Sequence, residues 1–161
     1  VRFGSPRTPT EIPASFIQAV DELCQKRIGE GHGFQRGQMV HWSKDYGLDV
    51  VAWRHLLDGL PGKLLLFGAC ASGGDWEDKL NDLQPANFCM EYMTQVPVSP
   101  IIKTFFIPHR IDQRLWLHRS RPAGIILDRC RISVLVPRLP AATHHGDPLH
   151  WTRAMLAGLS Q

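Results

Sequence analysis

The chain has 161 residues, of which 43% are apolar, and a formal net charge of +3. This length and composition favour a folded domain with its own hydrophobic core and argue against a disordered chain. No apolar run is long enough to cross a membrane, and no charged start followed by an apolar stretch indicates a signal peptide. The four cysteines lie far apart without a CxxC pair, which argues against structural zinc and a disulfide scaffold. We therefore expect a cytoplasmic protein in a reducing compartment.

The first half of the chain predicts a helix followed by three strands. Residues 1–12 show little periodicity and indicate an extended leader. From 14 to 28, apolar residues recur every three or four positions, which predicts an amphipathic helix that ends at a glycine-rich stretch. Strands are expected at 38–42, 48–54 and 63–71. The last of these is apolar on both faces and is therefore expected in the middle of a sheet.

The second half predicts a helix over about 75–93, which Pro85 kinks or divides, and strands at 101–108 and 123–128. Residues 129–137 fit a helix by length and a strand by their β-branched residues, and a short helix is expected at about 149–158. The order predicts an α/β layer arrangement. We expect a single domain at 13–161, with its core at about 14–108 and a basic C-terminal extension at 109–161.

Asp49 stands inside the apolar run 48–54. A carboxylate in a buried strand is costly unless something pairs with it. If the chain is an unrelated α/β interaction domain, Asp49 caps a turn or pairs with an arginine such as Arg54.

Both the order of elements and the stretch GLDVVAW at 47–53 resemble the PD-(D/E)XK family of restriction-endonuclease-like nucleases. In that family, Gly-x-Asp followed by apolar residues carries the metal-binding aspartate. The resemblance implies an αβββαβ core, in which helices flank a small mixed central sheet. It also implies that Asp49 binds a divalent cation, Mg²⁺ or Mn²⁺, and Mg²⁺ prefers such oxygen ligands.

The resemblance implies two further site residues and departs from the family at the third strand. Glu30, freed by flanking glycines, is expected as a second metal ligand, with a solvated loop residue as the alternative. The family expects an acid or amide and a lysine on the third strand, where this chain has Ala69 and Ala71. Lys79 is expected to replace that lysine from the following helix. The alternative is a surface ion pair with Asp75, four residues earlier.

Basic residues dominate the region from 103 to 138, with eight Lys or Arg against two Asp. This distribution predicts a surface that binds the phosphates of a nucleic acid, with a solvated basic face as the alternative. The residues expected to bind nucleic acid are Arg110, Arg114, Arg119 and Arg121. The motif HHGD at 144–147, with His150 nearby, is expected to be a loop rather than a metal site.

The function expected from the resemblance is Mg²⁺-dependent hydrolysis of DNA phosphodiesters, with Asp49, Glu30 and Lys79 in catalytic roles. RNA is the alternative substrate. The family also suggests antiviral defence in prokaryotes, within a larger protein or defence complex, and is compatible with a homodimer. The alternative function is a catalytically degraded nuclease-like domain that binds nucleic acid or a protein partner.

Overall fold

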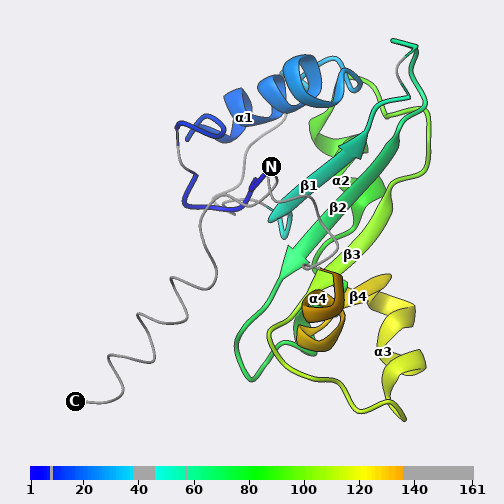
Figure 1. Cartoon of the computed structure of the whole chain (residues 1–161). Coiled ribbons are helices and arrows are strands. Elements are labelled where there is room, and N and C mark those ends of the chain that lie inside the picture. The colour runs from blue at the N-terminus through cyan, green and yellow to red at the C-terminus, as the bar shows by residue number, and fades with distance from the viewer. Residues whose placement is uncertain (8, 38–45, 57, 136–161) are drawn as a thin grey trace. The chain divides into compact units, whose positions relative to one another are not determined.

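The computed structural model describes residues 1–7, 9–37, 46–56 and 58–135 (Figure 1). Contacts divide the chain into two compact units, Val1–Arg129 and Cys130–Gln161. The elements in chain order are α1 (Phe16–Glu22), the π-helical η1 (Leu23–Ile28), β1 (Val50–Arg54), β2 (Leu64–Cys70), the 3-10 turn η2 (Asp78–Asn81), α2 (Pro85–Tyr92), β3 (Ile102–Phe106), α3 (Trp116–Ala123), β4 (Ile125–Leu127) and α4 (Arg129–Leu135). No helix within these ranges is long and apolar enough to cross a membrane.

The four strands form one sheet in the order β1-β2-β3-β4. β1 runs antiparallel to β2, whereas β2, β3 and β4 are mutually parallel. The two parallel connections each contain helical segments, as a parallel crossover requires. The α/β class and the central place of the predicted strand at 63–71 are therefore confirmed.

One face of the sheet is apolar and covered by helices. Phe67 of β2 meets Phe88 of α2 edge to face, with ring centroids 5.8 Å apart. Phe88 in turn lies 6.2 Å from Phe16 of α1, and both rings contact Tyr92. Such edge-to-face pairs suit the ring quadrupoles. The aromatic cluster thus fixes α1 and α2 on this face of the sheet (Figure 1).

The prediction of an extended leader at 1–12 was wrong: bends at 4–6 and turns at 9–11 fold this stretch back onto the domain, and it belongs to the hydrophobic core. The side chains of Phe3 and Ile12 are fully buried. The backbone N–H of Val51 donates to the carbonyl of Val1 at 2.9 Å, and Arg2 forms an antiparallel bridge with Val50. The start of the described chain therefore lies along the outer edge of β1.

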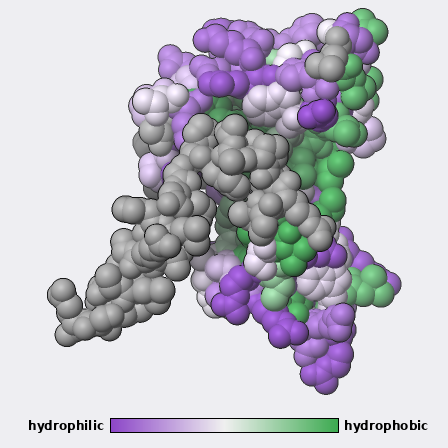
Figure 2. Space-filling model, in the orientation of Figure 1, coloured by the Kyte–Doolittle hydropathy of each residue, from purple (hydrophilic) through white to green (hydrophobic). Residues whose placement is uncertain are grey.

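The opposite face of the sheet also carries apolar side chains. Leu64 is 59% exposed there, and Ile102 and Ile125 are also exposed. In Figure 2, hydrophilic residues gather over α1 and around α3, and hydrophobic surface lies between them along the sheet. Gly68 also belongs to this face. A larger residue would not fit there, because a Cβ at position 68 would lie only 2.6 Å from the ring of Phe106.

The structure refines one helical prediction, confirms that Pro85 divides a second, and decides between the alternatives at a third. The helix expected at 14–28 is present, but its last part is π-helical, and Gly29 ends it with a φ of +67°. The helix expected at 75–93 is two segments, because Pro85 lacks an N–H and begins α2. The ambiguous stretch after residue 128 is the helix α4.

Helix α3 was not predicted at all. Its apolar residue Leu117 is 69% exposed, and Pro122 lies inside the helix, so the stretch has no clear apolar face. The strand expected at 38–42 and the helix expected at 149–158 lie outside the described residues.

Candidate functional site

Asp49 lies immediately before β1, at the carboxyl end of β2. Its Oδ2 accepts a 2.7 Å hydrogen bond from the backbone N–H of Cys70, the last residue of β2. Its own N–H donates to the carbonyl of Gly68 at 2.9 Å, and its carbonyl accepts from Phe3 and Gly4. The carboxylate of Asp49 therefore lies just before β1 rather than inside it. The backbone N–H of Cys70 is one of its partners, which offsets the cost of placing a charge next to an apolar strand.

Ala69 lies at the same end of the β1–β2 pair as Asp49, between Gly68 and Cys70, the two residues of β2 to which Asp49 is hydrogen-bonded. The strand pairing ends with Val50 opposite Gly68, and Asp49 and Ala69 follow directly beyond this pair. Both Ala69 and Ala71 are buried. A methyl group thus occupies the position at which the family resemblance places a second ligand.

Glu30 lies at the other end of β2. Its carboxylate accepts hydrogen bonds from the N–H groups of Gly62, Lys63 and Val98 at 3.0–3.2 Å, and its side chain is buried. Lys63 precedes β2 and Cys70 ends it, so at about 3.3 Å per residue the carboxylates of Glu30 and Asp49 are separated by about 20 Å. The structure does not bring these two predicted metal ligands together.

The backbone donors explain the ionisation of Glu30. Burial disfavours its charged form, but the N–H groups of Val98, Lys63 and Gly62 and the charge of Lys63 outweigh burial and lower the pKa of Glu30. The ammonium of Lys63 bonds to the carbonyl of Ile28 at 2.8 Å. Glu30 therefore ties three backbone segments together.

Lys79 lies in η2, and its ammonium is 3.2 Å from Oδ2 of Asp75. The sequence offered two roles for Lys79, a catalytic one and a surface ion pair with Asp75, and the structure contains this ion pair. Hydrogen bonding to Lys79 lowers the pKa of Asp75. Both side chains are well exposed, so the pair contributes little to stability.

The positions of Asp49 and Glu30 do not fit a shared divalent cation, since the two residues lie at opposite ends of β2. Within residues 1–7, 9–37, 46–56 and 58–135, no three His, Cys, Asp or Glu side chains are grouped so that they could hold a metal ion. Asp49 is the one predicted ligand at the carboxyl end of β2. The described residues therefore do not form the expected site of two carboxylates.

The four predicted nucleic-acid-binding arginines differ in their partners. Arg114 bonds to Asp112, with Nη2 and Oδ2 2.6 Å apart, and Arg119 pairs with Glu77 and is only 23% exposed. Arg110 and Arg121 are exposed, and neither forms a recorded ion pair with the described residues. Two of the four are thus available to a phosphate without first breaking an ion pair.

The carboxyl ends of the parallel strands bring a basic loop towards Asp49. Nε2 of His109, in the loop after β3, lies 3.1 Å from the carbonyl of Ser72, in the loop after β2. Ser72 is two residues beyond Cys70, the partner of Asp49. In open α/β sheets, ligands commonly bind outside the carboxyl ends of the strands. We define this region, with Asp49, Cys70, Ser72, His109 and Arg110, as the carboxyl edge.

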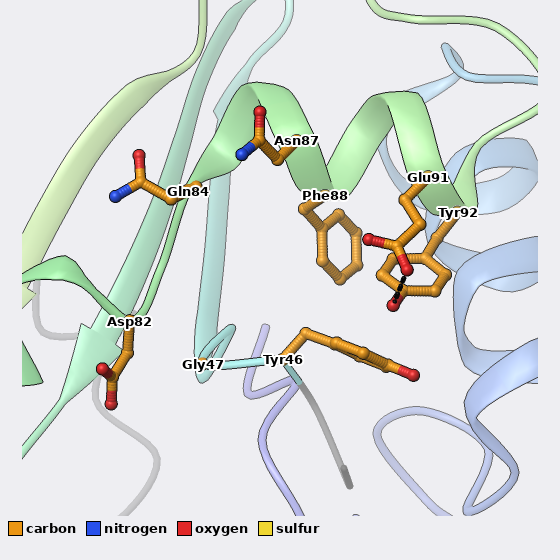
Figure 3. A pocket seen from close by; sticks show the side chains of 8 residues that line it. All are labelled: Tyr46, Gly47, Asp82, Gln84, Asn87, Phe88, Glu91 and Tyr92. Atoms are coloured by element: carbon orange, nitrogen blue, oxygen red, sulfur yellow. Dashed lines mark hydrogen bonds between the residues drawn. The ribbon is translucent and has the colours of Figure 1, made fainter. Parts of the chain in front are cut away.

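A pocket of about 550 Å³ adjoins Gly47, two residues before Asp49. In Figure 3, α2 runs along one side, and Phe88 and Tyr92 point from it towards Tyr46. Gly47 is required here, since its φ is +74° and a Cβ would lie 3.2 Å from the backbone nitrogen of Leu83. The lining residues are Tyr46, Gly47, Asp82, Gln84, Asn87, Phe88, Glu91 and Tyr92.

Sequence reasoning missed this pocket. The hydroxyl of Tyr92 donates to Oε1 of Glu91 at 2.6 Å, and burial, with this hydrogen bond, raises the pKa of Tyr92. In the sequence, Tyr46 and Gly47 simply precede the predicted strand at 48–54. No sequence pattern indicates that Tyr46 contacts α2, which begins 39 residues later at Pro85.

Lys103 was counted among the basic residues, but it lies on the covered face of the sheet. Its ammonium donates to the carbonyl of Leu80 at 2.9 Å. Burial lowers the pKa of Lys103, and the nearby charge of Asp82 opposes this shift. Lys103 therefore joins β3 to η2 rather than extending the basic surface.

Comparisons with protein-family models, with curated proteins and with solved structures found no match.

Proposed function

We propose that this chain is a nucleic-acid-binding domain with a restriction-endonuclease-like core, in which the catalytic centre of the PD-(D/E)XK nucleases is degraded. The observation that carries the proposal is that Asp49 is hydrogen-bonded to Gly68 and Cys70, the two residues that flank Ala69 on β2. An aspartate of the expected motif and an alanine at the expected ligand position meet at the same end of the sheet.

The sheet supports this assignment of the core. The resemblance expects strands, a helix and a further strand in one mixed sheet, and β1, β2, η2 with α2, and β3 are compatible with that order. The first of the three consecutive strands would fall at 38–42, outside the described residues.

The charges favour a nucleic acid as the partner, which we propose to be DNA, with RNA as the alternative. Arg110 follows His109 at the carboxyl edge, and Arg121 is exposed on α3. Arginines of this kind contact phosphates and give salt-dependent binding with little sequence preference. In this proposal the domain acts in the cytoplasm, as part of a larger antiviral-defence protein or complex or as a homodimer.

A second candidate function is metal-dependent hydrolysis of DNA, and the half-buried Asp49 at the carboxyl edge favours it. Mg²⁺ often takes only one or two carboxylates, with phosphate and water completing its ligands. The described residues do not form the two-carboxylate site that this second candidate would use.

Both candidates are tested by incubating supercoiled plasmid with the chain and Mg²⁺ or Mn²⁺. Gel shift reports binding, and conversion to nicked or linear plasmid reports cleavage. We expect a shift without cleavage, and we expect the variant Ala69→Gln to gain nicking that Asp49→Asn removes. Cleavage by the unchanged chain that Asp49→Asn abolishes would replace the proposal with the second candidate. Absence of a shift on DNA and on RNA would contradict both.

A further inference from the structure

We propose that the pocket between Tyr46 and α2 binds a single unpaired base of the bound nucleic acid. This inference rests on the proposed nucleic-acid binding and adds to it a specific contact. The backbone would be held by the arginines at the carboxyl edge and on α3, whereas the pocket would take one base.

The size and the walls of the pocket fit a flat aromatic group. Its volume of about 550 Å³ lies within the range of small-molecule sites. Tyr46 is half-buried and presents the ring for a base to stack on, whereas the rings of Phe88 and Tyr92 are buried behind it, with the centroids of Tyr46 and Tyr92 4.2 Å apart. Aromatic side chains stack on bases of any sequence.

The backbone of Tyr46 supports a specific role for its ring. Tyr46 has a φ of +53°, a left-handed conformation that bulky residues rarely adopt. Gly47 beside it is also left-handed, with a φ of +74°. Such conformations are concentrated at ligand-binding sites, where the surrounding structure maintains them. Here the conformation holds the aromatic ring at the wall of the pocket (Figure 3).

The polar groups of the pocket favour a base over a phosphate. The described residues that line it include two carboxylates, Asp82 and Glu91, and no Lys or Arg. A phosphate would be repelled by these carboxylates, whereas the amino groups of adenine, cytosine and guanine could donate to them. Gln84 and Asn87 add amides that can both donate and accept. The amide nitrogen of Gln84 bonds to the carbonyl of Asn81 at 2.9 Å, which orients its side chain.

The position of the pocket fits a nucleotide close to the carboxyl edge. Gly47 is two residues from Asp49, so their Cα atoms lie within about 7 Å. Successive nucleotides rise about 3.4 Å along one strand of a duplex. A base within one or two nucleotides of the carboxyl edge could therefore reach the pocket, from a single strand or after extrusion from a duplex.

The test compares a 12-nucleotide single-stranded DNA of mixed sequence with an abasic strand of the same length and charge. Binding is followed by fluorescence anisotropy at fixed salt. We expect the abasic strand to bind about tenfold more weakly, since base stacking on aromatic side chains is lost. Asn87→Ala or Tyr46→Leu should reduce that ratio, while Met90→Ala, an exposed position on α2 outside the pocket, should leave it unchanged.

Equal affinity of the unchanged chain for both strands would overturn the pocket assignment and leave the proposed binding function in place. The same conclusion follows if neither Asn87→Ala nor Tyr46→Leu changes the ratio. Absence of binding to any DNA or RNA strand would instead contradict the proposed function itself. Thermal unfolding of each variant verifies that the fold is retained.

Discussion

The carboxylate of Asp49 bonds to the backbone N–H of Cys70 at 2.7 Å, and this contact closes the end of the β1–β2 pair. Asp49 immediately precedes β1, and Cys70 ends β2, which runs antiparallel to β1. The contact places a negative charge at the carboxyl edge, directly before β1. Asp49 therefore has a structural role whether or not it ever binds a cation.

We predict that Asp49→Ala destabilises the fold by about 1–2 kcal/mol, because it leaves the N–H of Cys70 without its acceptor. Asp49→Asn keeps an acceptor oxygen and should cost less. Urea unfolding of the two variants measures the difference. Equal losses would show that the charge of Asp49, rather than its hydrogen bond, supports the fold.

Gly4 lies directly against Asp49. A Cβ at Gly4 would overlap Oδ1 of Asp49 and lie 3.1 Å from its Cα. We therefore expect Gly4→Ala to destabilise the protein by about 1–3 kcal/mol, as overpacking of a core does. Gly74→Ala is the matched control, because a Cβ there meets no atom within 4 Å. Equal unfolding midpoints for these two variants would contradict the packing of Gly4 on Asp49.

Glu30 should make the stability of the protein depend on pH in the acid range. Its folded-state pKa is lowered, so its contribution is present above the ordinary value of 4.5 and is lost as pH falls through the folded-state pKa. Glu30→Gln should cost about 1–3 kcal/mol at pH 7 and less at pH 3. Urea unfolding at both pH values tests this, with the exposed Glu11→Gln as control. An equal loss at both pH values would contradict the role of the charge.

Cys70 should respond to the charge of Asp49. Burial of the thiol, with the negative charge of Asp49, raises the pKa of Cys70 to about 11. The thiolate is the reactive form, so Asp49→Asn should lower this pKa and speed alkylation of Cys70 severalfold at pH 8–9. Mass spectrometry after iodoacetamide treatment measures the rate, with exposed Cys130 as the internal reference. An unchanged ratio of the two rates would contradict the coupling.

Much of the fold could be predicted because it follows local patterns. The apolar run at 63–71 identified the central strand, and Pro85 marked where a helix begins. Helix α3 could not be predicted, because exposed leucines such as Leu117 and a proline within the helix remove its amphipathic signal.

The candidate site was predicted less well, because it depends on contacts between distant segments. The glycines that flank Glu30 suggested that it could reach a cleft. Instead, backbone N–H groups hold its carboxylate next to the start of β2. Lys79 lies one turn from Asp75 and pairs with it, as its spacing allowed. The pocket depends on Tyr46 meeting α2, a contact that no local sequence pattern indicates.

The most direct test of the central claim is the salt dependence of DNA binding. Anisotropy titrations of a labelled duplex between about 50 and 200 mM salt give the slope of log K against log salt. We predict tighter binding at low salt, and a slope that Arg110→Ala and Arg121→Ala each flatten by about 0.9, the value for one phosphate contact. Arg114→Ala, at the arginine paired with Asp112, should flatten it less. If the chain does not bind DNA, or if none of these substitutions changes the slope, the proposed nucleic-acid-binding function is wrong.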